Sequence, residues 1–187
     1  MGHLPDLERV FFLHEQATND HADDSCCLSL QRDFLAGDEA RWAEVRDQHL
    51  AAFGLLAEEA GAIARESSGW YIARPLVFAA HHVAELALKT ATLSRRGDWS
   101  LGAAGHALAS LLDLDREVNG PRQASRIWED QLVHMLDQAW EAGRYPDRRS
   151  GEPLFDEWCC VSASALHRAI DVFTSLVDRP GSLAGIW

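Results

Sequence analysis

The sequence predicts an all-α protein, an up-and-down helical bundle of about five helices with short extra N-terminal helices. Apolar residues recur at intervals of three and four along the chain, and the strict alternation that marks β-strands is missing. The connections between the periodic segments have the lengths that are typical of helical bundles. With 187 residues, 47% of them hydrophobic and 25% charged, the chain has the composition of a globular domain, which excludes wholesale disorder.

Residues 1–37 are predicted to form an N-terminal extension that carries two short helices, at 4–16 and 25–35. The bundle is predicted to occupy residues 38–180 and to open with a helix over 38–65. Apolar residues recur through this first bundle helix at helical spacing, and the sequence Glu-Ser-Ser-Gly ends it.

The next helix, from Tyr71 to about Arg96, has the clearest pattern, because its apolar positions step by four and three along one stripe. Pro75 is tolerated in its first turn, where a missing backbone N–H costs little. Gly120-Pro121 predicts a break later in the chain, and Gly143 is expected to end the helix after that break. The remaining helices are predicted at 105–117, 125–141 and 154–178.

The formal net charge of −12 is unevenly placed along the chain. Residues 1–66 carry 14 acidic and 5 basic side chains, whereas residues 67–187 carry 15 and 12. An acidic chain is repelled by phosphate backbones at long range, so RNA binding is disfavoured, although a local arginine cleft in the second part is allowed. Every basic residue except Lys89 is an arginine, whose guanidinium suits bidentate contacts with carboxylate or phosphate.

The sequence contains neither a membrane-spanning segment nor a signal peptide, and this bears on where the protein is expected to be. No apolar run approaches the ~18 residues that a bilayer span requires. The first ten residues contain no signal-peptide core. We therefore expect a cytoplasmic protein that does not enter the membrane.

The cysteines form two adjacent pairs, Cys26-Cys27 and Cys159-Cys160, and neither pair has the spacing of a zinc site or of a disulfide framework. We expect free, largely buried thiols, with a zinc site that joins the two pairs as the alternative. A ferritin-like di-iron site requires Glu-x-x-His on two helices, a sequence that is absent here. Neither a metal nor another cofactor is predicted.

Three pieces of the second part of the chain resemble one family. The segment FAAHHVAELALKTATLSRRG is followed by GHALASLL, and GRYPD precedes the last helix. A helix with A-x-E-x-A-L-K, a histidine that opens the next helix as H-x-L-x-x-L, and an R-Y-P corner look like the HEPN family of small prokaryotic helical bundles. The resemblance covers roughly residues 71–178. It implies a four- to five-helix bundle, frequently a homodimer, in toxin–antitoxin, stress or defence systems, with a protein partner encoded nearby.

Many HEPN proteins are metal-independent RNA endonucleases that carry Arg, four to six residues, then His. Arg neutralises the scissile phosphate while His moves a proton at the ribose 2′-hydroxyl. The late-helix candidates here, Arg126 and His134, have seven residues between them, which separates their Cα atoms by about 12 Å along the helix axis. The competing interpretation is a solvated helix face that also contains Asp130, Asp137 and Glu141. The family spacing itself occurs no more often than chance predicts, at Arg9–His14 and Arg74–His81.

A polar stripe runs beside the apolar stripe of the 71–96 helix. Within it, Glu85 and Lys89 form an i, i+4 pair of the favourable orientation. Together with the other positions of the family pattern, they are predicted to form a polar cluster of His82, Glu85, Lys89, His106, Arg144 and Tyr145. Two interpretations stay open: the cluster holds the R-Y-P corner in place, or it binds a phosphate-bearing ligand.

The sequence therefore favours an HEPN-like binding or regulatory module of a bacterial stress, defence or toxin–antitoxin system. Its ligand would be a phosphate-bearing molecule or RNA. The alternative is a metal-independent RNA endonuclease of the same fold, with Arg126 and His134 as its catalytic residues. The acidic charge and the missing Arg/His spacing favour the module.

Overall fold

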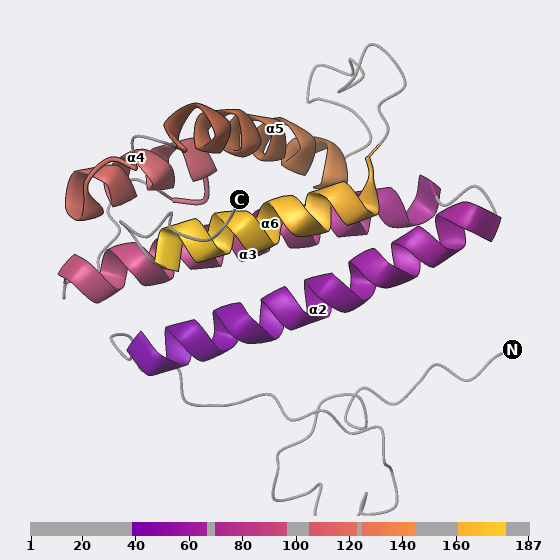
Figure 1. Ribbon diagram of the computed structural model, residues 1–187, viewed down its shortest axis with the longest axis horizontal. Helices are drawn as coiled ribbons and strands as arrows, with labels where there is room; N and C mark the ends of the chain where they lie inside the picture. The colour runs from indigo at the N-terminus through magenta and orange to yellow at the C-terminus, as the bar shows by residue number, and fades with distance from the viewer. Residues whose placement is uncertain (1–38, 67–69, 97–104, 123–124, 145–160, 179–187) are drawn as a thin grey trace, which may run out of the picture. The chain divides into compact units, whose positions relative to one another are not determined.

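The computed structural model describes residues 39–66, 70–96, 105–122, 125–144 and 161–178, all of which belong to the unit Ala36–Trp187. Within these ranges every regular element is an α-helix, so the prediction of an all-α bundle is confirmed (Figure 1). The helices are α2 (Glu39–Glu66), α3 (Trp70–Arg96), α4 (Leu108–Asn119), α5 (Arg126–Arg144) and α6 (Ala163–Asp178). The predicted extension over 1–37 and both cysteine pairs lie outside the described residues.

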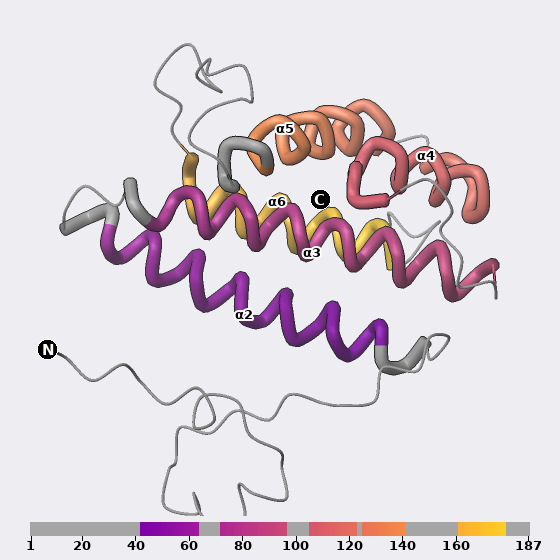
Figure 2. The backbone as a smooth tube through the Cα atoms, turned by 180° about the vertical axis from the view of Figure 1, so that it is seen from behind, coloured from indigo at the N-terminus to yellow at the C-terminus, as the bar shows by residue number. Residues whose placement is uncertain are grey.

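Helix α3 is the centre of the bundle and contacts each of the other four helices. It lies between α2 on one side and α4 and α5 on the other, while α6 runs beside it (Figure 2). From Ala80 to Thr90, every position of α3 except His82 is buried. Most of these buried positions are apolar, as the apolar stripe predicted for this helix requires, and His81, Glu85, Lys89 and Thr90 are its buried polar residues.

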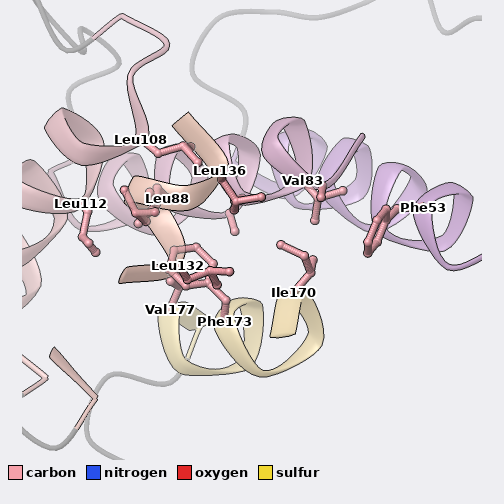
Figure 3. Close-up of a cluster of buried hydrophobic side chains, with 14 of the residues drawn as sticks. Phe53, Val83, Leu88, Leu108, Leu112, Leu132, Leu136, Ile170, Phe173 and Val177 are labelled. Carbon is pink, nitrogen blue, oxygen red and sulfur yellow. The ribbon is translucent and has the colours of Figure 1, made fainter. Parts of the chain in front are cut away.

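The hydrophobic core forms where the inner faces of the five helices meet (Figure 3). Phe53 and Phe173 are its largest members and are fully buried. Burying a side chain of this size stabilises the fold by about 1.5–3 kcal/mol relative to leaving it exposed. Further contributions come from Val83, Leu88, Leu108, Leu112, Leu132, Leu136, Ile170 and Val177.

Three predicted helix ends differ from the structure by three residues or more. Helix α4 begins at Leu108 and not at 105, because Gly105 and His106 form a turn. Helix α6 begins at Ala163, and Val161 and Ser162 are not helical, whereas the sequence predicted a helix from about residue 154. Ser162 starts the helix as its N-cap, since its Oγ accepts a hydrogen bond from the backbone N–H of Ala165 at 3.4 Å. Helix α5 continues through Gly143 to Arg144, because one glycine costs a helix only about 1 kcal/mol and does not end it.

Among the helices that the structure describes, none is long and apolar enough to cross a membrane.

Candidate functional site

The structure brings together four of the six residues of the predicted polar cluster, around the carboxylate of Glu85. Its Oε1 accepts hydrogen bonds from Lys89 Nζ at 2.5 Å and from His106 Nδ1 at 2.6 Å. His82 Nδ1 lies 3.6 Å from Oε2. Glu85 and Lys89 are buried, whereas 37% of the His82 side chain and 70% of the His106 side chain are exposed. We call these four residues the Glu85 cluster.

Local sequence accounts for this convergence. His82, Glu85 and Lys89 follow one another at intervals of three and four on α3, which places them on one face of the helix. His106 lies in the turn before α4, where Gly105 adopts a φ of 57°. A positive φ is accessible to glycine at little cost, and it turns the chain so that His106 reaches α3.

The electrostatic balance at Glu85 favours its charged form. Burial raises the pKa of the carboxyl, but the hydrogen bonds from His82, Lys89 and His106 and the charge of Lys89 outweigh burial and lower the pKa to about 2. Glu85 is therefore a fixed negative charge at neutral pH. It holds the Nδ1 side of both imidazoles and leaves the opposite edge of each ring facing away from the carboxylate.

The other predicted site residues do not join the Glu85 cluster in the described part of the chain. Arg126 and His134 are both exposed on α5, and His134 Nε2 accepts a hydrogen bond from the side-chain amide of Gln138 at 3.0 Å. Arg144 is the last residue of α5 and its side chain is not described, and Tyr145 lies outside the described residues. No hydrogen bond or ion pair joins Arg126 to His134 in the structure.

Asp137 connects three helices, a role that the sequence analysis did not predict when it placed this residue on a solvated face. Its Oδ1 accepts hydrogen bonds from His81 Nε2 at 3.1 Å and from the backbone N–H of Leu108 at 3.0 Å. Its Oδ2 accepts one from the N–H of Ala109 at 3.1 Å. An α5 carboxylate thereby caps the N-terminus of α4, where backbone donors lack partners within the helix. His81 is fully buried and stacks on Trp140 at 4.8 Å.

The same contacts set the charge state of Asp137. Burial raises the pKa of its carboxyl, but the hydrogen bonds from His81 and from the backbone of Leu108 and Ala109 outweigh burial, so the pKa lies below its ordinary value. The carboxylate remains charged at neutral pH and interacts favourably with the positive, N-terminal end of the α4 dipole.

A second ionic group, which we call the Arg122 network, closes the opposite end of α4 against α5. Arg122 lies 2.7 Å from Asp115 and 2.7 Å from Glu129, and both carboxylates are fully buried. Arg116 joins Glu129 at 3.1 Å and Asp130 at 2.6 Å. Burial lowers the pKa of Arg122, but its contacts with Glu129 and Asp115 outweigh burial and raise the pKa. These pairs fix the segment between α4 and α5.

His49 of α2 extends the Glu85 cluster on its exposed side. Its ring packs edge-on against the ring of His82, with 4.6 Å between the centroids. Burial lowers the pKa of His49, and repulsion from His82 lowers it further. His49 could not be assigned to the cluster from the sequence, because nothing in the spacing along α2 connects it to α3.

The Glu85 cluster lies at the surface, outside both cavities that described residues line. Described residues line a cavity of about 550 Å³ between α2, α3 and α6, and another of about 220 Å³ beside Arg46 and Asn119, but neither cavity includes a member of the cluster. His82 and His106 are nevertheless exposed, and histidine can donate to phosphate or transfer protons.

No group of three or more His, Cys, Asp or Glu in the described ranges is arranged to hold a metal ion. Comparisons of the chain with known protein families, with curated proteins and with solved structures find no match.

Proposed function

We propose that the chain is an HEPN-like binding or regulatory module of a bacterial stress, defence or toxin–antitoxin system, and that it binds a phosphate-bearing ligand at the Glu85 cluster. The observation that carries this proposal is the 2.6 Å hydrogen bond between Glu85 and His106. It joins the A-x-E-x-A-L-K helix to the H-x-L-x-x-L helix, so two of the three pieces that resemble the family meet at one place.

Charge balance supports an anionic ligand at this place. Lys89 neutralises Glu85, so protonation of His82 or His106 leaves the cluster with a net positive charge. Both imidazoles reach the surface and are oriented through Nδ1 by the same carboxylate, so a protonated ring has its Nε2–H left to donate to a phosphate oxygen. With either imidazole protonated, the site would be a small positive region on a chain whose formal charge is −12.

Binding of inorganic phosphate and of a short 5′-phosphorylated RNA oligonucleotide tests the proposal. In a nuclear magnetic resonance titration, we expect shifts at His82 and His106. We also expect His106→Gln and His82→Gln to weaken binding by about tenfold each, the effect of one lost charge-assisted hydrogen bond. His167→Gln on α6 is the matched control, because His167 is also half-exposed and lies 3.6 Å from a carboxylate, that of Asp171. Equal affinities for all three variants and the wild type would contradict ligand binding at this cluster.

The second candidate function is the metal-independent RNA endonuclease, and one observation favours it. His106 is an exposed imidazole held at Nδ1 by a buried carboxylate, the arrangement that orients a general acid or base. We nevertheless expect no RNA cleavage, because Arg126 and His134 are not brought together and the net charge repels the substrate. Cleavage without added metal that is abolished by His106→Ala, His134→Ala or Arg126→Ala would replace the binding module with the nuclease.

We further propose a cytoplasmic homodimer with a protein partner encoded nearby. Large apolar side chains that remain exposed support an association: Leu55 on α2, and Ile127 and Met135 on α5. Sedimentation equilibrium at micromolar concentration is expected to show a dimer. A monomer at that concentration would contradict the homodimer and leave these side chains to a different partner.

A further inference from the structure

The contact between His49 and His82 joins two helices through a pair of groups that both become positive on protonation. The ring centroids are 4.6 Å apart and the planes are nearly perpendicular, at 88°. His82 also lies beside Glu85, whereas no carboxylate of the described ranges forms an ion pair with His49. Two positive charges at this distance repel each other unless an anion lies against both rings.

We infer that an oxyanion binds against both rings of the His49–His82 pair, so that ligand binding at the Glu85 cluster takes up a proton. This inference rests on the proposed function and adds two features to it: His49 becomes a residue of the site, and pH becomes its regulator. The ligand class is a tetrahedral dianion, a phosphate group or its equivalent, because such a group can accept N–H donors from two imidazoles at once.

The charged groups around the pair differ between its two rings. Glu85 is adjacent to His82 and is ionised, and Lys89 and His106 contact the same carboxylate. On α2, Arg46 lies one turn before His49, but it is bound to Asp47 and Asp178. Protonation of His49 is unfavourable in the free protein, because burial and the charge of His82 lower the pKa of His49.

An anion that lies against both rings makes protonation of His49 favourable. Its negative charge offsets the repulsion between the two imidazolium rings, so the bound state retains a proton that the free state gives up. Linkage then requires the reciprocal effect: acidification strengthens anion binding by the same factor by which the anion favours protonation. One additional positive charge near a dianion in a solvated site corresponds to about tenfold in affinity.

Sulfate is the probe, because its own charge does not change between pH 5.5 and 7.5. Calorimetric titration of the full chain is expected to give about tenfold tighter binding at the lower pH. Titrations in two buffers with different ionisation heats should show net proton uptake. His49→Gln is expected to retain sulfate binding with a smaller pH dependence than the wild type, while the control His167→Gln behaves as the wild type. His49 and His167 belong to different helices, and each packs edge-on against one ring, His82 or Phe53.

The possible results separate the inference from the proposed function. Sulfate binding that is equal at both pH values, or that depends on pH equally in His49→Gln and the wild type, overturns the proton coupling and leaves the binding site standing. The absence of sulfate binding at both pH values overturns the proton coupling and the proposed binding site together. A second measurement makes the test independent of affinity: with saturating sulfate, the protonation midpoint of His49 in a nuclear magnetic resonance titration must move upward.

Discussion

Asp137 on α5 and His81 on α3 share a hydrogen bond of 3.1 Å, and the same carboxylate closes the N-terminus of α4. Three helices therefore depend on one side chain. Because Glu85 holds His106 in the turn just before α4, the start of this helix is fixed from α3 and from α5 at once. The Glu85 cluster is thus positioned by contacts that are themselves structural.

Asp137→Ala is expected to lower the free energy of unfolding by about 2–3 kcal/mol, as the sum of a lost helix cap and an unpaired His81 nitrogen. Asp137→Asn, which retains one oxygen acceptor, should lose less. Urea unfolding measures both changes. Asp171→Ala on α6 is the control, because this carboxylate is about half exposed and is expected to cost little. Equal losses for Asp137→Ala and Asp171→Ala would show that Asp137 does not function as a cap.

Glu85→Gln tests the charge state of the cluster through acid stability. The pKa of Glu85 is about 2 in the folded state against an ordinary value of 4.5, so its charge stabilises the fold above pH 4.5. This contribution is about 3 kcal/mol and is lost as the pH falls from 4.5 to 2. The stability difference between the wild type and Glu85→Gln should therefore be constant near neutral pH and shrink through that interval.

The measurement is thermal unfolding at a series of pH values, with Glu58→Gln on the exposed face of α2 as the control. A difference between the wild type and Glu85→Gln that stays constant down to pH 2 would contradict the lowered pKa of Glu85.

The helices could be predicted from the sequence wherever burial is one-sided or complete. The pattern of α3 predicted its bounds to within a residue, because its apolar positions step by four and three along the whole helix and nearly every position between Ala80 and Thr90 is buried. The start of α6 was predicted too early because Val161 and Ser162 fit the apolar and polar periods of a helix. Only the capping bond to Ala165 distinguishes Ser162 from a residue inside the helix.

Contacts within one helix and contacts between helices differ in how well the sequence predicts them. His82, Glu85 and Lys89 could be grouped because three- and four-residue steps place side chains on one face. Asp137 was assigned to the face of Arg126 and His134 by the same rule. The rule does not say which edge of that face meets a neighbouring helix, and the crossing of α4 and α5 decides it.

The Arg122 network predicts a large cost for removing its central cation. Arg122→Met leaves the buried carboxylate of Asp115 without a cation, while Glu129 retains Arg116, and an uncompensated buried charge costs about 3–5 kcal/mol. Arg122→Lys keeps the charge but loses the planar fork that meets two carboxylates, so it should fall between Arg122→Met and the wild type. Urea unfolding of both variants, beside Arg168→Met at an exposed position of α6, measures the order. A loss below about 1 kcal/mol for Arg122→Met would place the network among weak surface pairs.

Two glycines within α2 give the last prediction, because the same substitution meets different surroundings. A Cβ at Gly61 would meet no atom within 4 Å beyond its chain neighbours and the nearby backbone of α2, so Gly61→Ala should stabilise the protein by about 0.5–1 kcal/mol through helix propensity alone. A Cβ at Gly54 would lie 3.3 Å from His167 Nε2, so the ring must shift away from its edge-on contact with Phe53.

Gly54→Ala is therefore expected to gain less than Gly61→Ala, or to lose stability, in thermal or urea unfolding. Combining Gly54→Ala with His167→Ala removes the obstruction and should recover the helix-propensity gain relative to His167→Ala alone. If Gly54→Ala stabilises as much as Gly61→Ala and the double variant adds nothing, His167 does not hold its position against α2. A destabilising Gly61→Ala would mean that the open space beside α2 is occupied in solution.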